Sequence, residues 1–431
     1  MGTGVNVVYE RPGPSRQDLT RAAAVFAVGL SASLVFISAC QLIPPESDAL
    51  EYYRIARNLA AGNGFSFDGA HPYTYRPPLF PLLLGMWFRL AGASALSAAV
   101  YQCLLHGLSA AASYLLFRAL RCTPKWATVL SLAVALQPTL VSKAAFILQE
   151  PTLLFFTTAA LLATVIWLNE RSGKWASIAG ISWGVVTLGK SVTLIALPLA
   201  MVYWFARGGA DRRNASVQAA LFTLFFLVAL APWTIRNYLV LHRVVPVNDQ
   251  GTGMLEWNVV NASPAGGPDG ESYVADLDRR GITGEQRKEL LWRYIGDHLR
   301  HFLVVRVYRN AVSFASPARE WWWAIGRYGP GESRPWYWTL HDYFHRFLFL
   351  FLLFRVFQVA RGRLHAPSAF IALFCLAYWG QYALLVGGPR FGVPVYPALL
   401  SLLIPGDTGA SATGGGGGNI RSFAFSVGKR R

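Results

Sequence analysis

The sequence contains ten long apolar stretches, and this feature restricts the possible folds more than any other. They cover residues 22–43, 95–117, 126–142, 145–168, 176–190, 192–206, 215–233, 342–360, 367–386 and 391–405. A helix needs about 20 mostly apolar residues to cross the roughly 30 Å hydrocarbon core of a bilayer. The lipid offers no hydrogen-bond partners to the backbone, so spans of this kind are helical. The sequence therefore predicts an all-α, polytopic membrane protein with about ten transmembrane helices.

The composition agrees with this class, since 54% of the residues are hydrophobic and only 14% are charged. Soluble domains carry about 25% charged residues. Two details of the span pattern stay open. Lys190 and Ser191 separate two short spans, which could also form one long span with a polar kink. Residues 78–90 are apolar but too few to cross a bilayer, which predicts a re-entrant or interfacial helix.

The net charge of +17 is explained by how the basic residues are distributed. Seventeen Lys and Arg lie in segments that alternate along the chain: 1–21, 118–125, 170–174, 207–213, 361–365 and 406–431. By the positive-inside rule these segments are cytoplasmic, and so are both termini. The loops 44–94 and 234–341 then face outward. The second carries 13 basic and 11 acidic residues. The charge excess thus reflects membrane topology, and a nucleic acid partner is not needed to explain it.

This topology divides the chain into three parts. A cytoplasmic N-terminal tail covers residues 1–21, one transmembrane domain covers 22–405, and a flexible Gly-rich cytoplasmic tail covers 406–431. Within the second outer loop, residues 285–314 have the apolar spacing of one helical face, which predicts an amphipathic helix on the outer leaflet; the face consists of Leu291, Ile295, Leu299, Phe302 and Val305. Trp321–Trp323, with Trp336 and Trp338, is typical of an interfacial aromatic belt.

Charged residues at membrane depth are costly and are functional candidates by default. Those outside the cytoplasmic segments gather at the outer ends of the predicted spans: Glu46, Asp48, Glu51, Arg76, Lys143, Glu150, Lys190, Arg236 and Arg390. Acids and bases that converge on one side of the membrane indicate an anion-binding catalytic pocket, with or without a metal ion, at the outer surface.

Several short motifs resemble those of GT-C glycosyltransferases. The first outer loop has an Asp soon after the first span, an amphipathic helix, Gly62-Asn63-Gly64-Phe65, and a Pro-rich segment that begins at Arg76. The similarity continues through Gln149-Glu150-Pro151, Gly189-Lys190, residues 232–238 and Pro389-Arg390-Phe391, and covers roughly residues 20–405. It is strongest for the branch that uses polyprenyl-phosphate sugars, with the protein O-mannosyltransferases and lipid A aminoarabinose transferases.

The resemblance implies a GT-C-like fold with an outward-facing helical cap. It implies a hexosyl- or pentosyltransferase that moves a sugar from a polyprenyl-phosphate donor to a glycan, lipid or protein acceptor. The reaction would take place at the outer (periplasmic or exoplasmic) face of a membrane, and we expect the bacterial inner membrane. A transporter or flippase of lipid-linked intermediates is the alternative. A transporter places its polar groups near the bilayer midplane on broken helices, whereas the charges here lie at the outer edge.

In this family the Asp of the first outer loop is the essential carboxylate, and it corresponds to Asp48. A carboxylate can accept the proton of the acceptor hydroxyl or hold a divalent cation against the donor phosphate. Glu46 could share such a metal ion, whereas Ala49 stands where many relatives have a second acid. Glu150 matches the acid of the second outer loop. Capping of a helix N-terminus is the structural alternative for Asp48 and Glu150.

The leaving group would be a polyprenyl phosphate, whose negative charge grows as the glycosidic bond breaks. Fixed cations at that position stabilise the transition state. The candidates for donor-phosphate binding are Arg76, Lys190, Arg236 and Arg390. The alternative for each is a side chain that reaches lipid headgroups from the membrane interface.

Overall fold

The structure, a computed structural model, describes residues 14–39, 42, 45–207, 212–262, 268–316, 336–384 and 387–404. Over these ranges the chain is helical and forms no strand, apart from one isolated antiparallel bridge between Ser66 and Pro72. The predicted all-α class is confirmed. The tails 1–13 and 405–431, and the predicted aromatic belt at Trp321–Trp323, lie outside the described residues.

The helices follow the apolar stretches of the sequence closely. Those of the first half are α1 (Arg16–Ala39), α2 (Ser47–Ala61), α3 (Leu79–Ala91), α4 (Ala95–Ala119), α5 (Pro124–Ala135), α6 (Pro138–Ser142), η1 (Lys143–Ala145), α7 (Glu150–Glu170), α8 (Gly173–Gly189), η2 (Ser191–Ile195) and α9 (Ala196–Arg207). Those of the second half are α10 (Arg212–Leu241), α11 (Gly251–Ala262), α12 (Pro268–Arg279), α13 (Gly284–Asp297), α14 (Leu299–His301), η3 (Phe302–Arg306), α15 (Val307–Phe314), α17 (Trp336–Ala360), α18 (Ala366–Leu384), η4 (Pro389–Val395) and α19 (Tyr396–Ser401).

Each of the ten predicted spans coincides with a helix or a broken helix. In the described part of the chain, five helices are long and apolar enough to cross a membrane: α1, α4, α7, α10 and α17. A sixth span is formed if α5 and the segment Pro138–Ala145, which meet at a bend of 46°, count together. The chain breaks at Lys190, so α8 and α9 are separate helices. The exact number of ten spans stays a prediction.

The first span begins earlier than its apolar stretch indicates. Asp18 donates its backbone N–H to Ser15 Oγ at 3.1 Å, and its carboxylate accepts from the hydroxyl and the backbone N–H of Ser15. This reciprocal pattern caps a helix N-terminus. Asp18 also accepts from Arg118 Nε at 2.8 Å, which fixes the end of α1 against α4. The last six residues of the predicted N-terminal tail are therefore helical.

Close packing of α8 against α10 gives the bundle a rigid centre. A methyl group on Gly180 would lie 2.3 Å from the carbonyl oxygen of Phe222, and one on Gly184 would lie 2.7 Å from that of Phe226. Two glycines four residues apart allow the backbones of neighbouring membrane helices to approach this closely. Lys190, which follows α8, is thereby held at a fixed depth in the bundle.

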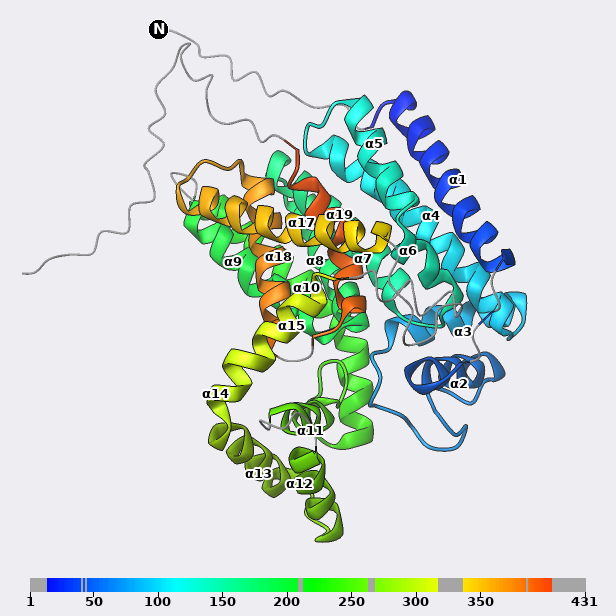
Figure 1. The fold of residues 1–431 in the computed structure, drawn as a ribbon. Helices are drawn as coiled ribbons and strands as arrows, with labels where there is room; N and C mark the ends of the chain where they lie inside the picture. The colour runs from blue at the N-terminus through cyan, green and yellow to red at the C-terminus, as the bar shows by residue number, and fades with distance from the viewer. Residues whose placement is uncertain are drawn as a thin grey trace, which may run out of the picture.

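The segments between spans form a cap at one end of the bundle, where Figure 1 shows α2 together with α11, α12 and α13. Within it, Leu291 and Ile295 of α13 are buried against Val259 of α11 and Leu277 of α12. The sequence predicted that this apolar face lies on the outer leaflet, and for these residues that prediction is wrong. An apolar helix face can be buried by protein as well as by lipid, and periodicity does not distinguish the two.

The two long loops are joined to each other at this end of the bundle. Trp233 on α10 donates its indole N–H to the carbonyl oxygen of Val247 at 2.7 Å. Asn237, one turn later, donates to the carbonyls of Val245 and Val247, both at 3.0 Å. The backbone N–H of Asp249 in turn donates to the carbonyl of Thr74 in the first loop. These bonds place the second loop beside the segment that leads to Arg76.

Candidate active site

Asp48 lies in the first turn of α2, directly after a strained backbone position. Ser47 has φ 48°, in the left-handed region that residues other than glycine rarely adopt. The N-cap position is held by Glu46, whose side chain makes no capping hydrogen bond. Capping therefore does not account for the Asp48 carboxylate, because the structure places its two oxygens against other partners.

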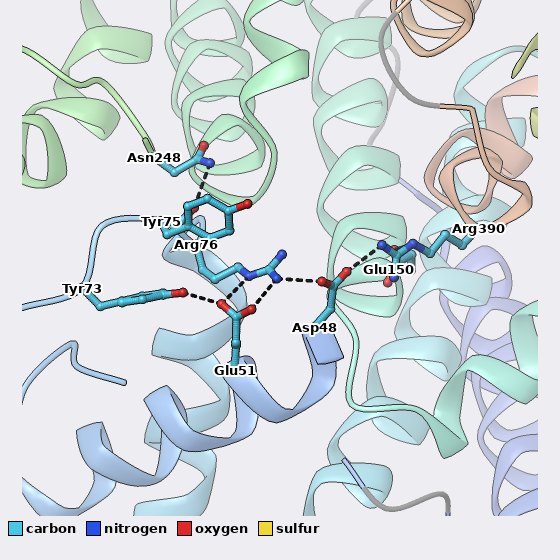
Figure 2. A network of polar contacts seen from close by, with 8 residues as sticks. All are labelled: Asp48, Glu51, Tyr73, Tyr75, Arg76, Glu150, Asn248 and Arg390. Carbon is cyan, nitrogen blue, oxygen red and sulfur yellow. Dashed lines mark hydrogen bonds and ion pairs between the residues drawn. The ribbon is translucent and has the colours of Figure 1, made fainter. Parts of the chain in front are cut away.

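Two arginines from distant parts of the chain hold the Asp48 carboxylate from both sides. Arg76 Nη2, just before α3, donates to Asp48 Oδ1 at 2.7 Å, and Arg390 Nη2 of η4 donates to Asp48 Oδ2 at 2.6 Å. Figure 2 shows this arrangement, in which Asp48 lies between the two guanidinium groups. Charge-assisted hydrogen bonds of this length are among the strongest in proteins. Asp48 thus connects the first outer loop to the last membrane segment.

Glu150, the first residue of α7, lies beside the same cluster. Its Oε1 is 3.8 Å from Arg390 Nε, and the side chain is almost completely buried. Its second oxygen, Oε2, is buried and has no hydrogen-bond partner among the described residues. A buried carboxylate oxygen without a partner is costly in a purely structural role. Its place beside Arg390 keeps Glu150 as a candidate site residue.

Lys190 approaches the cluster from the break between α8 and η2. Its Nζ lies 4.6 Å from the ring centroid of Phe391, the residue after Arg390. With the Gln149 amide oriented to satisfy its neighbours, Gln149 Oε1 accepts from Lys190 Nζ at 3.0 Å and the amide nitrogen donates to the carbonyl of Gly189. Lys190 is therefore linked to Gln149, the residue that directly precedes Glu150.

The charges of the first loop are mutually stabilised. Burial favours the neutral form of Asp48, but Arg390 and Arg76 outweigh it and hold the pKa of that carboxyl below its usual value. The same holds for Glu51. Burial raises the pKa of its carboxyl, but the hydrogen bonds from Arg76 and Tyr73 lower that pKa by a larger amount. The pKa of Arg76 is raised, because its contacts with Glu51, Tyr52 and Asp48 outweigh the effect of burial. Asp48 and Glu51 are ionised at neutral pH.

Arg236 lies apart from these contacts. Its guanidinium donates to the backbone carbonyls of Tyr73, at 2.9 Å, and Phe65, at 3.3 Å, and packs over the rings of Phe65 and Trp233. Among the described residues its hydrogen bonds hold the first loop and do not reach the acids of the cluster. Of the residues to which the sequence gave a catalytic or phosphate-binding role, the structure thus brings together Asp48, Glu150, Arg76, Lys190 and Arg390.

Glu46, the predicted second metal ligand, is exposed at the start of α2. Asp48 has a guanidinium on each of its oxygens, which is an unfavourable surrounding for a cation. In the described part of the chain, no three His, Cys, Asp or Glu side chains are grouped so that they could hold a metal ion. These residues, as arranged, do not fit a divalent cation.

Two residues of the cluster received no role from the sequence. Glu51 accepts from Arg76 Nε at 2.9 Å and from Arg76 Nη2 at 2.7 Å, and the hydroxyl of Tyr73 donates to the same carboxylate. The signal for Glu51 was its spacing, since it stands three residues after Asp48 and therefore on the same helical face. Nothing in the sequence indicated which cation it would meet.

Comparison with known proteins shows that the chain is similar, in part of its sequence and in its fold, to membrane glycosyltransferases. The sequence model of the family described as dolichyl-phosphate-mannose-protein mannosyltransferase matches residues 75–235, which include Arg76, Glu150 and Lys190. Comparison with curated protein sequences gives no significant match. The resemblance found in the sequence motifs is thus supported by an independent match over the central part of the chain.

Solved structures with a similar fold include the following two. One is the archaeal oligosaccharyltransferase AglB from Archaeoglobus fulgidus, in complex with an inhibitory peptide and a dolichol-phosphate. It has 15% identity and a TM-score of 0.54, with 90% of this chain and 50% of that chain covered. The other is ArnT from Cupriavidus metallidurans bound to undecaprenyl phosphate, with 18% identity and a TM-score of 0.53, covering 88% and 58%. This chain thus spans about half the length of the structures it matches. The predicted GT-C-like fold is confirmed.

Proposed function

We propose that this protein is a glycosyltransferase that moves a hexosyl or pentosyl group from a polyprenyl-phosphate donor to an acceptor hydroxyl at the outer face of a membrane. The observation that carries the proposal is the Asp48 carboxylate, ionised between Arg76 and Arg390 and beside Glu150 and Lys190. The family match over residues 75–235 supports the same chemistry. The bound lipid phosphates of the AglB and ArnT structures support a donor of this class.

In the proposed reaction the acceptor oxygen forms a bond to the anomeric carbon of the sugar. The bond between that carbon and the phosphate oxygen breaks, and its electron pair leaves with the polyprenyl phosphate. The acceptor proton passes to a carboxylate, for which Asp48 is the first candidate and Glu150, through its unpartnered Oε2, is the second. Both are close enough to Arg390 for one substrate to contact all three.

The negative charge that develops on the leaving phosphate is matched by cations already in place. Arg390 and Arg76 place guanidinium groups, which fit phosphate oxygens, beside Asp48. Lys190, whose ammonium also lies over the ring of Phe391, adds a third positive charge. We assign Arg236 to holding the first loop, because its hydrogen bonds go to the carbonyls of Phe65 and Tyr73. No step is assigned to a metal ion, since the donor set does not fit one.

For its location we propose a bacterial inner membrane, with both termini in the cytoplasm and the cap outside. The distribution of seventeen Lys and Arg over alternating segments supports this orientation. Reporter fusions after residues 70 and 280 should be active outside the cell, and a fusion after residue 210 should be active inside. A fusion at 280 that is active only in the cytoplasm would contradict the proposed side of the reaction.

The activity is tested with purified protein and a panel of labelled polyprenyl-phosphate sugars. Release of polyprenyl phosphate together with transfer to an added acceptor supports the proposal. Movement of intact donor between the leaflets of a proteoliposome, without release, would indicate a flippase. Addition of a chelator should leave the rate unchanged, and a rate that needs a divalent cation would return the Asp48 carboxylate to the role of metal ligand.

A further inference from the structure

We infer that Glu51, held in turn by Tyr73, is a positioning residue that fixes Arg76 against Asp48. The inference rests on the proposed function and adds to it a residue that does not touch the substrate. Figure 2 shows the chain of contacts from Tyr73 through Glu51 and Arg76 to Asp48.

The first step of the argument is the geometry of the contact between Glu51 and Arg76. Nε and Nη2 of Arg76 each face a different oxygen of Glu51, at 2.9 and 2.7 Å, which is the two-point pairing that fixes the orientation of a guanidinium plane. Only Nη2 continues to Asp48. Glu51 therefore determines where the Arg76 guanidinium lies, and it leaves only Nη2 in contact with the Asp48 carboxylate.

The second step is the enclosure of this pair. Arg76 is 9% exposed, and its guanidinium carbon lies 5.4 Å from the ring of Tyr52 and 5.3 Å from that of Tyr75. The Arg76 guanidinium therefore packs over two aromatic rings. Tyr73 donates its hydroxyl to the Glu51 oxygen that also accepts from Arg76 Nε, so Glu51 is itself held in one position. The orientation of the Arg76 guanidinium is therefore fixed by the two aromatic rings and by Glu51, which Tyr73 holds in turn.

The third step is the balance of charge. Arg76 pairs with two carboxylates, and Glu51 is the one with two hydrogen bonds to it. If the Glu51 charge is removed, Arg76 keeps only Asp48 as a charged partner. Its fork is then free to turn fully toward Asp48, which stabilises the ionised carboxylate and makes it a weaker base. The net charge around the donor site also rises by one, which favours an anionic lipid phosphate.

These steps predict a fall in kcat without a loss of affinity for the lipid phosphate. In Glu51→Gln the value of kcat should fall by about tenfold or more, the scale expected when a reacting group is misaligned. The affinity for undecaprenyl phosphate should stay the same or increase. Tyr73→Phe should change both quantities in the same directions by smaller factors. Glu289→Gln removes an equal charge from an exposed position on α13 and serves as the control with wild-type kinetics.

The decisive experiment is a double-mutant cycle of Glu51→Gln and Arg76→Ala. Three quantities are measured for each protein: kcat, the dissociation constant of undecaprenyl phosphate, and the melting temperature. Because Glu51 acts on the reacting carboxylate through Arg76, Glu51→Gln should have little further effect on kcat in the Arg76→Ala background. Equal effects in both backgrounds, or a Glu51→Gln protein with wild-type kcat, would overturn the inference.

The melting temperatures separate a failure of this inference from a failure of the proposed function. If the wild type transfers no sugar from any donor, the proposed function fails. The cycle in melting temperature then still decides whether Glu51 holds Arg76. Additive changes in melting temperature would refute the contact, and strongly non-additive changes would establish it whatever reaction the protein catalyses.

Discussion

Replacement of Gly387 by alanine should lower kcat/KM strongly, through a contact that lies outside the reacting cluster. Gly387 precedes Arg390 by three residues and lies directly against α15. A methyl group there would be 2.1 Å from the Cα atom of Asn310 and 2.4 Å from its Cβ atom. Ordinary van der Waals contact begins at about 3.4 Å, so the two backbones would have to separate by roughly 1.3 Å.

That displacement is large compared with the contacts it would disturb. Arg390 Nη2 is 2.6 Å from Asp48 Oδ2, and a shift of about 1 Å brings such a bond to the limit of hydrogen bonding. A misplacement of this size costs on the order of 10²-fold in rate. Overpacking of this kind typically costs about 1–3 kcal/mol of stability. We therefore expect kcat/KM to fall by about 10²-fold and the melting temperature to fall modestly.

The assay is sugar release from labelled donor, combined with thermal unfolding of the same preparations. Gly380→Ala is the matched control, because Gly380 lies on α18 and a methyl group there meets open space. It should keep wild-type activity. Asn310→Ala tests the same junction without added atoms, since it removes the bond from Asn310 Nδ2 to the carbonyl of Ala383 at 3.0 Å. Wild-type kcat/KM in a folded Gly387→Ala protein would refute the reasoning.

Three further predictions follow from the site. Lys190→Ala and Arg390→Ala should raise the dissociation constant of undecaprenyl phosphate at least about tenfold, and tight binding by Lys190→Ala would contradict this. Arg236→Ala should leave the dissociation constant within about twofold and instead speed proteolysis of residues 65–73, because the half-buried Arg236 donates to the carbonyls of that loop and a hydrogen bond from a charged group contributes about 1.5–3 kcal/mol. Since the pKa values of Asp48 and Glu51 are lowered, their contribution to stability is complete above the unfolded pKa near 4 and is lost as the pH falls through the folded values. Melting temperatures should therefore be flat between about pH 8 and pH 5 and fall only below about pH 4, and a decline that begins near pH 6 would show that other groups control stability.

Much of the fold could be predicted from the sequence, because the bilayer imposes a simple requirement on it. The apolar stretches 95–117 and 145–168 correspond to α4 and α7, since in lipid a helix satisfies its own backbone. Boundaries were less certain: α1 begins at Arg16 because Ser15 and Asp18 cap it, a local interaction that hydropathy does not register.

The site was predicted less completely, because side-chain contacts between distant residues depend on the tertiary structure. Charges at the outer ends of spans indicated a set of candidates, and six of them converge: Asp48, Glu51, Arg76, Glu150, Lys190 and Arg390. Whether Arg236 faces the cluster or the loop carbonyls of Phe65 and Tyr73 depends on how α10 is rotated, which the sequence does not specify. The pairing of Glu51 with Arg76 joins residues 25 positions apart through a turn. Leu291 and Ile295 were correctly recognised as an apolar face, but their partner proved to be the cap itself.

The central claim is that Asp48, between Arg76 and Arg390, is the reacting carboxylate. The most direct test is a single-turnover measurement on the wild type and Asp48→Asn, with labelled donor bound before the acceptor is added. The substitution keeps the shape of the side chain between Arg76 and Arg390 and removes its charge. We predict that Asp48→Asn inserts into the membrane, binds undecaprenyl phosphate and transfers sugar at least about 10²-fold more slowly. Transfer at the wild-type rate would contradict the account and move the chemistry to another carboxylate, with Glu150 the next candidate.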